Sequence, residues 1–115
     1  MTVTIYHNPR CSKSRQTLQL LRDNDVEPQI VEYLKTPPDA ATLARLLDML
    51  GLEPRELMRK KEKEYKELGL AKKDLSRDAL IAAMVAQPKL IERPIVIKGA
   101  KAALGRPPED VLKIL

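Results

Sequence analysis

Cys11, the only cysteine of the 115-residue chain, lies in the stretch YHNPRCSKSRQTL between an apparent strand and an apparent helix. At a helix N-terminus, unpaired backbone N–H groups and the helix dipole stabilise negative charge. The neighbouring Arg10, Lys13 and Arg15 add positive potential. These features favour the thiolate, the nucleophilic form of cysteine, and could also hold an oxyanion beside the sulfur. We predict a reactive Cys11; the alternative is a structural cysteine at the edge of the core.

Two polar residues near Cys11 have more than one possible role. His7 could interact with the thiolate, or it could hydrogen-bond the loop at the end of the strand. Ser14, three residues after the cysteine, could donate a hydrogen bond to the thiolate or the substrate, or it could help to cap the helix. Both residues are therefore predicted to support the site.

The spacing around Cys11 excludes two familiar thiol motifs. A Cys-x-x-Cys oxidoreductase would have its second thiol at position 14, which is Ser14. A phosphatase-type loop would have an arginine six residues after the cysteine, but that residue is Thr17 and Arg15 comes too early. A covalent adduct on a lone thiolate must then be released by an external thiol.

The composition narrows the class of protein. With 43% hydrophobic and 32% charged residues, the chain is an ordinary globular protein with an aliphatic core, and its net charge of +5 favours anionic partners. The basic stretch RKKEKEYKE (59–67) mixes both signs, and the chain has three tyrosines as its only aromatic residues, so we expect no nucleic-acid binding. Without an apolar membrane span or a signal-peptide pattern, and with a single cysteine, we expect a cytoplasmic protein that does not bind membranes.

Hydrophobic periodicity and turn signals predict the order of elements around the cysteine. A strand over 2–8, a helix over 12–24 and a strand over 27–34 form a βαβ unit with a right-handed crossover. Prolines, Asp39 and Gly51 then mark the start and end of a helix within 36–52.

The rest of the chain is predicted to be helical and then β-rich. One or two short helices over 53–70 would turn four side chains inward: Leu57, Met58, Tyr65 and Leu68. Ser76 caps a further helix that ends before Pro88. Two short strands joined through Gly99 and a helix near the C-terminus follow, over 93–98, 100–104 and 107–115.

This order of elements, β-α-β, helices and β-β-α, predicts an α/β thioredoxin-like fold with a mixed sheet. We expect one domain over 1–115 with a helical insertion at about 39–87. In that fold a reactive cysteine follows the first strand, at the position that Cys11 occupies by its own pattern.

Six motifs that together span essentially the whole chain resemble those of one family in their order and spacing. They are IYHNPRCSKSRQTL, EYLKTPP, LMRKKE, YKELGL, LIERPIV and GRPPEDVL. The chain resembles the glutaredoxin-coupled arsenate reductases, the ArsC family. Ser12, Lys13 and Ser14 after the cysteine, and the end at Leu115, are most similar to its short chromosomal members. The resemblance implies reduction of arsenate to arsenite with glutathione and glutaredoxin as the electron source.

The same resemblance implies a set of site residues. Cys11 would be the nucleophile, and Arg59, Arg93 and Arg106 would bind the oxyanion. Guanidinium groups suit this task because their forked donors match tetrahedral oxyanions. Pro94 is expected to be the cis-proline that precedes the third strand.

The implied partners are arsenate or a similar oxyanion, glutathione as co-substrate, and glutaredoxin. We expect a monomer with no bound cofactor and no metal. Two other functions stay open. A glutathione-dependent thiol reductase of the same fold would need Cys11 but tolerate the loss of Arg59 or Arg106. A non-enzymatic transcription regulator resembling Spx-type proteins would typically carry a Cys-x-x-Cys switch, which this chain lacks.

Overall fold

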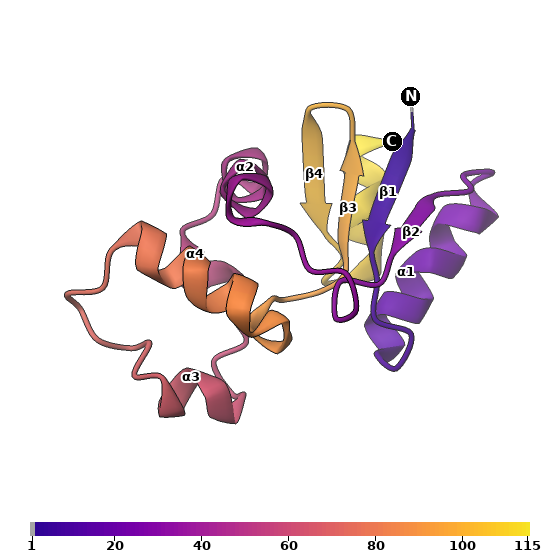
Figure 1. Ribbon diagram of the computed structural model, residues 1–115. Helices are drawn as coiled ribbons and strands as arrows, with labels where there is room; N and C mark the ends of the chain where they lie inside the picture. Colours follow the sequence, from indigo (N-terminus) through magenta and orange to yellow (C-terminus); the bar gives the residue numbers. More distant parts are fainter. Residues whose placement is uncertain (1) are drawn as a thin grey trace. The chain divides into compact units, whose positions relative to one another are not determined.

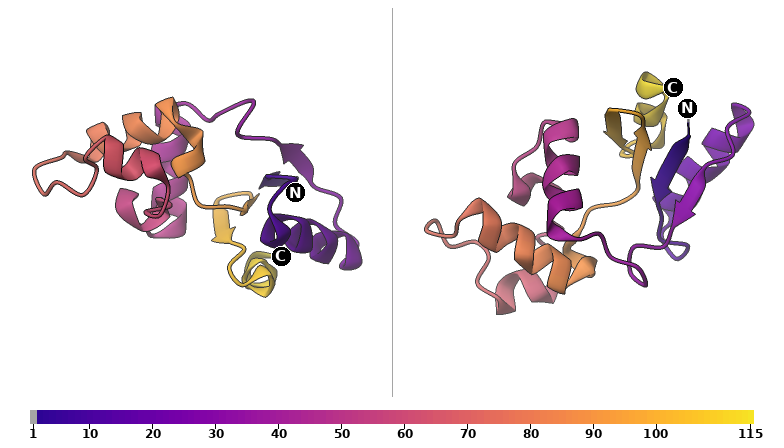
Figure 2. Two further views of the ribbon diagram at one scale, coloured as in Figure 1. Left: turned by 90° about the horizontal axis from the view of Figure 1, so that it is seen from below. Right: turned by 45° about the horizontal axis from the view of Figure 1, so that its top comes forward.

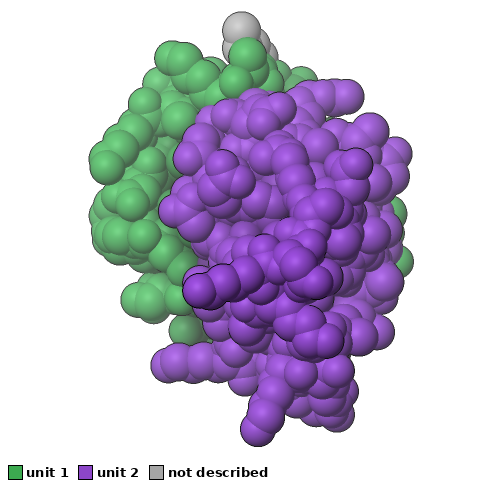
Figure 3. All heavy atoms as spheres, turned by 90° about the vertical axis from the view of Figure 1, so that its left-hand side faces the viewer, with its two compact units in different colours: residues 1–36, 93–115 green, residues 37–92 purple. Residues whose placement is uncertain are grey.

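The computed structural model describes residues 2–115. The chain forms two compact units, Met1–Thr36 with Arg93–Leu115 and Pro37–Glu92, shown in separate colours in Figure 3. The helical insertion expected at about 39–87 lies within the second unit. The expectation of a single domain over the whole chain stays a prediction.

The first unit is built on a four-stranded sheet in the order β2-β1-β3-β4. The strands are β1 (Val3–Tyr6), β2 (Gln29–Val31), β3 (Ile95–Lys98) and β4 (Lys101–Leu104). β1 pairs parallel with β2 and antiparallel with β3, and β3 pairs antiparallel with β4. The mixed sheet is therefore confirmed. β2 is shorter than expected because the chain turns directly after it, where Lys35 and Thr36 both donate to the carbonyl of Glu32 at 2.9 Å.

Two helical segments cover one face of this sheet, α1 (Ser12–Asp23) and η3 (Pro108–Ile114), and they lie side by side (Figures 1 and 2). Their contact with the sheet is an aliphatic cluster of Val3, Ile5, Leu21, Val96 and Val111. η3 is a 3-10 helix, whereas the sequence pattern predicts an α-helix. Short segments readily adopt this tighter turn. Here the backbone N–H of Asp110 donates to the carbonyl of Pro107, three residues earlier, which is the hydrogen bond of a 3-10 helix.

The second unit contains two well-capped helices, α2 (Ala40–Leu50) and α4 (Arg77–Ala86). Asp39 accepts a hydrogen bond from the backbone of Thr42 at the start of α2, and Gly51 ends it in the left-handed conformation at φ 69°. Ser76 caps α4 by accepting from the backbone of Ala79. These starts and ends confirm the sequence prediction.

The segment between α2 and α4 contains η1 (Pro54–Leu57) and α3 (Lys63–Glu67), and η2 (Pro88–Leu90) follows α4. One inward-facing prediction here is wrong, because Leu68 is 50% exposed. Leu70 is buried instead, and so is Glu64 within the charged stretch 59–67. The five-residue α3 is too short to continue the helical periodicity that placed Leu68 on an inner face.

Within residues 2–115, no helix combines the length and apolar character needed to cross a bilayer.

Candidate functional site

Cys11 is the N-cap residue of α1, as the sequence pattern predicts. Asn8 shapes the loop that leads to it. The backbone N–H of Cys11 donates to the carbonyl of Asn8 at 3.0 Å, and the backbone N–H of Arg10 donates to Asn8 Oδ1 at 3.0 Å. The carbonyl of Cys11 then accepts the first helical bond, from Arg15. Cys11 is 9% exposed.

The surroundings of Cys11 favour its thiolate. Burial opposes ionisation of the thiol, but interactions with the backbone N–H groups of Ser14 and Lys13 and with the Arg93 guanidinium outweigh it. The pKa of Cys11 is therefore lowered from its ordinary value. The first turn of α1 holds no acidic residue that would oppose this effect. The arrangement gives a nucleophilic sulfur at lower pH than a free thiol would.

His7 and Ser14 form a buried pair directly beneath the loop. His7 Nδ1 and Ser14 Oγ are hydrogen-bonded at 2.6 Å, and Ser14 Oγ also accepts from the backbone N–H of Asn8 at 3.0 Å. Burial lowers the pKa of His7 and favours neutral imidazole. The negative charge of Glu32 opposes this effect, and the positive charges of Arg15 and Arg22 add to it. The Ser14 hydroxyl thus joins the strand end to the helix, while the Ser14 backbone N–H acts on the thiol.

Arg93, Pro94 and Arg106 lie together at one end of β3 and β4. The Arg93–Pro94 peptide bond is cis, as expected, and so is the Arg106–Pro107 bond, which the sequence pattern did not predict. Arg93 is 9% exposed. Arg106 Nε donates a hydrogen bond to the backbone carbonyl of Arg93 at 3.0 Å. The structure therefore brings two of the three predicted arginines together and places Arg93 at the thiol.

Gly105 allows this end of the sheet to approach α1. A Cβ on Gly105 would lie 2.7 Å from Cγ of Pro94 and 2.7 Å from Oγ1 of Thr17. The backbone N–H of Gly105 also donates to the carbonyl of Pro94 at 2.9 Å. Sequence reasoning missed Gly105 and Asn8 as supports of the site. The Asn8-Pro9 dipeptide is a turn signal that could have identified Asn8, but no local signal identifies Gly105.

Arg59 belongs to the second unit, where acidic side chains hold it. Its Nη1 is 2.9 Å from Glu62 Oε1, and its Nε is 4.0 Å from Glu92 Oε1. Its backbone N–H donates to the carbonyl of Leu90 at 2.7 Å. The part of Arg59 in oxyanion binding stays a prediction.

The basic residues next to Cys11 in the sequence act on the site in different ways. Arg15 donates through Nη1 to the carbonyl of Pro9 at 2.9 Å, so its guanidinium braces the loop. Lys13 acts on the thiol through its backbone N–H. The charged side chain that acts on the sulfur is that of Arg93, which lies far away in the sequence.

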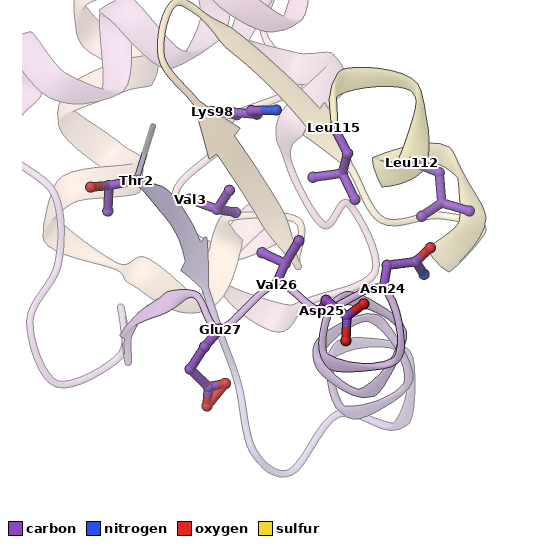
Figure 4. Close-up of a pocket in the computed structure, with 9 residues that line it drawn as sticks. All are labelled: Thr2, Val3, Asn24, Asp25, Val26, Glu27, Lys98, Leu112 and Leu115. Atoms are coloured by element: carbon purple, nitrogen blue, oxygen red, sulfur yellow. The ribbon is translucent and has the colours of Figure 1, made fainter.

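The described part of the chain, residues 2–115, holds no group of three His, Cys, Asp or Glu side chains suited to a metal ion. A cavity of about 690 Å³ lies at the other end of α1, where Asn24 and Asp25 contribute to its wall (Figure 4). The predicted site residues do not line this cavity. At Cys11 the described residues offer the chemistry of an activated thiolate with the Arg93 guanidinium beside it.

Comparison with known proteins supports the same interpretation. The model of the ArsC family matches residues 6–114. The chain is 64% identical over 114 residues to the protein named "Uncharacterized protein YfgD" of Escherichia coli strain K12, with 98% of this chain and 96% of that protein covered. It is 47% identical over 114 residues to an arsenate reductase of Neisseria meningitidis, with 98% and 97% covered.

A solved structure shows the same fold. The arsenate reductase from Vibrio cholerae superposes with a TM-score of 0.98 at 57% sequence identity, and the match covers 100% of this chain and 98% of that one. The predicted α/β thioredoxin-like fold is therefore confirmed.

Proposed function

Because the chain belongs to the ArsC family, we propose that it reduces arsenate to arsenite with Cys11 as the nucleophile. The observation that carries the proposal is the thiol at the N-cap of α1, where two backbone N–H groups and the Arg93 guanidinium lower its pKa. The names of the N. meningitidis relative and the V. cholerae structure support arsenate as the substrate.

In the first step, the Cys11 thiolate attacks arsenic, a sulfur–arsenic bond forms, and one oxygen of arsenate leaves as water after protonation. The oxyanion brings negative charge to a site that already stabilises a thiolate, so its oxygens need cationic partners. Arg93 is at the thiol, and Arg106 is bonded to the Arg93 carbonyl. We assign these two guanidinium groups, together with Arg59, to oxyanion binding.

The electrons must come from outside the chain, because Cys11 is its only cysteine. Reduction of arsenic from the pentavalent to the trivalent state takes two electrons, which two external thiols supply as they become one disulfide. We assign these thiols to glutathione and glutaredoxin. Glutathione forms a second sulfur–arsenic bond with loss of water. The glutaredoxin thiolate then takes the glutathione sulfur as a mixed disulfide, which leaves the electron pair of that bond on arsenic as As(III), and water hydrolyses the bond between Cys11 and arsenic to release arsenite. We also propose that the protein is a cytoplasmic monomer without a bound cofactor.

The test is arsenate-dependent oxidation of NADPH in the presence of glutathione, glutaredoxin and glutathione reductase. The wild-type protein should turn over arsenate, and Cys11→Ser should show no turnover above the background without protein. Arg45→Gln is the matched control, because it removes an exposed arginine of α2 and should retain wild-type activity. Omission of glutaredoxin alone should lower the rate sharply.

Three results would contradict different parts of the proposal. Equal turnover in wild type and Cys11→Ser would exclude Cys11 as the nucleophile. Unchanged turnover without glutaredoxin would exclude that electron source. No arsenate turnover, with Cys11 still rapidly alkylated at neutral pH, would favour the thiol reductase of the same fold.

A further inference from the structure

A cleft of about 220 Å³ lies beside the loop that carries Cys11. One wall is the loop itself, from His7 to Arg10, and the other is the turn after β2, with Glu32, Leu34 and Lys35. All of these residues belong to the first unit. Because Arg10 is covalently joined to Cys11, the cleft begins one residue from the nucleophile.

The side chains of this cleft combine opposite charges with an apolar surface. Lys35 Nζ is 3.5 Å from Glu32 Oε1, and both side chains are largely exposed, at 78% and 42%. Arg10 is also exposed, on the opposite wall. Leu34 is 42% exposed and gives the cleft an apolar surface. A matching ligand would carry carboxylates near both ends, an ammonium group near one end, and an uncharged middle.

We propose that this cleft binds glutathione and presents its sulfur to Cys11. The glycine carboxylate would pair with Arg10, and the α-carboxylate and α-ammonium of the γ-glutamyl end would pair with Lys35 and Glu32. The proposal rests on the proposed function in one respect, the use of glutathione as co-substrate. It adds the place where glutathione binds and the residues that select it.

The size and position of the cleft suit this ligand. Consecutive residues of an extended peptide are about 3.5 Å apart, so the cysteine of a glutathione whose glycine carboxylate pairs with Arg10 lies one residue from the group that is bound next to Cys11. Charged pairs at an exposed surface contribute modestly each, which suits a co-substrate that must leave after each turnover. The cavity of Figure 4 is a poorer candidate, because Asn24 and Asp25 place it at the far end of α1 from Cys11.

The test uses a reaction that needs neither arsenate nor glutaredoxin. The Cys11 thiolate attacks glutathione disulfide, a mixed disulfide forms on Cys11, and one glutathione leaves as its thiolate. Mass spectrometry of acid-quenched samples gives the second-order rate constant. Two further disulfides serve as probes: dithiodiglycolate, which has the same net charge as glutathione disulfide but no peptide, and uncharged hydroxyethyl disulfide.

The variant is the double substitution Arg10→Gln/Lys35→Gln, and the matched control is Lys101→Gln/Lys113→Gln. The control removes the same charge from exposed positions of the same unit outside the cleft. We expect the first variant to lose about tenfold in rate with glutathione disulfide, at most about twofold with dithiodiglycolate, and nothing with hydroxyethyl disulfide. The control should keep all three rates within about twofold.

Two outcomes would overturn the proposal. Equal losses with both anionic disulfides would mean that Arg10 and Lys35 act only by long-range attraction. Unchanged rates with glutathione disulfide would mean that the cleft does not bind it. Failure of the proposed function has a different signature, since a protein that does not reduce arsenate could still show the selective tenfold loss in this assay.

Discussion

The N-termini of α1 and α2 both stabilise a negative charge through backbone N–H groups, but the two charges have different roles. Asp39 at the start of α2 accepts a hydrogen bond from the backbone N–H of Thr42 at 2.8 Å, and that N–H lowers the pKa of its carboxyl. Cys11 at the start of α1 forms no comparable side-chain capping bond, yet backbone N–H groups of the same turn lower its pKa as well. Both helix ends therefore stabilise a negative charge.

The difference lies in what surrounds each charge. Asp39 is exposed, and its negative charge serves the stability of the helix. Cys11 is buried to 9% exposure, has the Arg93 guanidinium beside it, and follows a loop that Asn8 holds in place. A helix N-terminus becomes a reactive site when residues distant in the sequence add positive charge there and the anion is not used in a side-chain capping bond. Three predictions test this comparison.

The largest effect is expected from removing the cation that only the α1 start has. In Arg93→Met the pKa of Cys11 should rise, so the pH midpoint of its alkylation by iodoacetamide should move to higher pH. A lowered pKa in the wild type places thiolate reactivity at lower pH, and the variant loses part of this shift. kcat/KM for arsenate should fall about a hundredfold because an oxyanion partner is lost.

Arg106→Met is the control for this first prediction. Arg93 lowers the thiol pKa, whereas Arg106 donates a hydrogen bond through Nε to the Arg93 carbonyl. Its loss should raise KM for arsenate and leave the alkylation midpoint in place. A midpoint that stays unchanged in Arg93→Met would show that the helix N-terminus alone activates Cys11.

The second prediction concerns the close packing behind the site. Gly105→Ala would place a methyl group 2.7 Å from both Pro94 and Thr17. We expect this overpacking to lower the free energy of unfolding by about 2 kcal/mol, measured by urea denaturation. Gly51→Ala, at the end of α2, meets no atom within 4 Å and bears only the strain of φ 69°.

Gly51→Ala should therefore cost about 1 kcal/mol in the same experiment. It should leave the alkylation rate of Cys11 unchanged, whereas Gly105→Ala should change that rate because Thr17 and Pro94 must move apart. Equal alkylation rates in the two variants would show that the approach of Gly105 to α1 does not position the thiol.

The smallest effect concerns the cap residues themselves. Ser76→Ala removes the capping bond to Ala79 at the start of α4 and should lower the free energy of unfolding by about 1 kcal/mol. Cys11→Ser introduces a hydroxyl where no capping bond exists, so at pH 5 it should raise the free energy of unfolding by about 0.5 kcal/mol. A loss as large as that of Ser76→Ala would mean that the thiol already stabilises α1.

Local signals in the sequence predicted much of the fold. Asp39, Gly51 and Ser76 mark helix ends through hydrogen bonds and backbone angles that involve only nearby residues, and the structure has all three ends in place. Leu68 shows where this reasoning fails. The helical periodicity predicted that Leu68 faces inward, but the five-residue α3 ends at Glu67, so the periodicity does not extend to Leu68, which is exposed.

The candidate site divides in the same way. The alternation of β1 and the pattern of α1 were enough to place Cys11 at a helix start, since both depend on neighbours along the chain. Family resemblance pointed to Arg93, but spacing alone could not have separated it from the 21 Lys and Arg residues of the chain. Nor did any pattern indicate that Gly105 must be small to admit Thr17 and Pro94.

Local sequence patterns were sufficient to place a single thiol, without a second cysteine to resolve it, at the N-terminus of a helix. The cationic side chain that lowers the pKa of this thiol is brought to it by the tertiary structure. Arg10, Lys13 and Arg15 are nearest in the chain, yet Arg93 is the charged side chain that acts on the sulfur. The reason is that electrostatic interaction falls with distance in space and depends on burial. Separation along the chain does not enter, so only the folded sheet could bring Arg93 to Cys11.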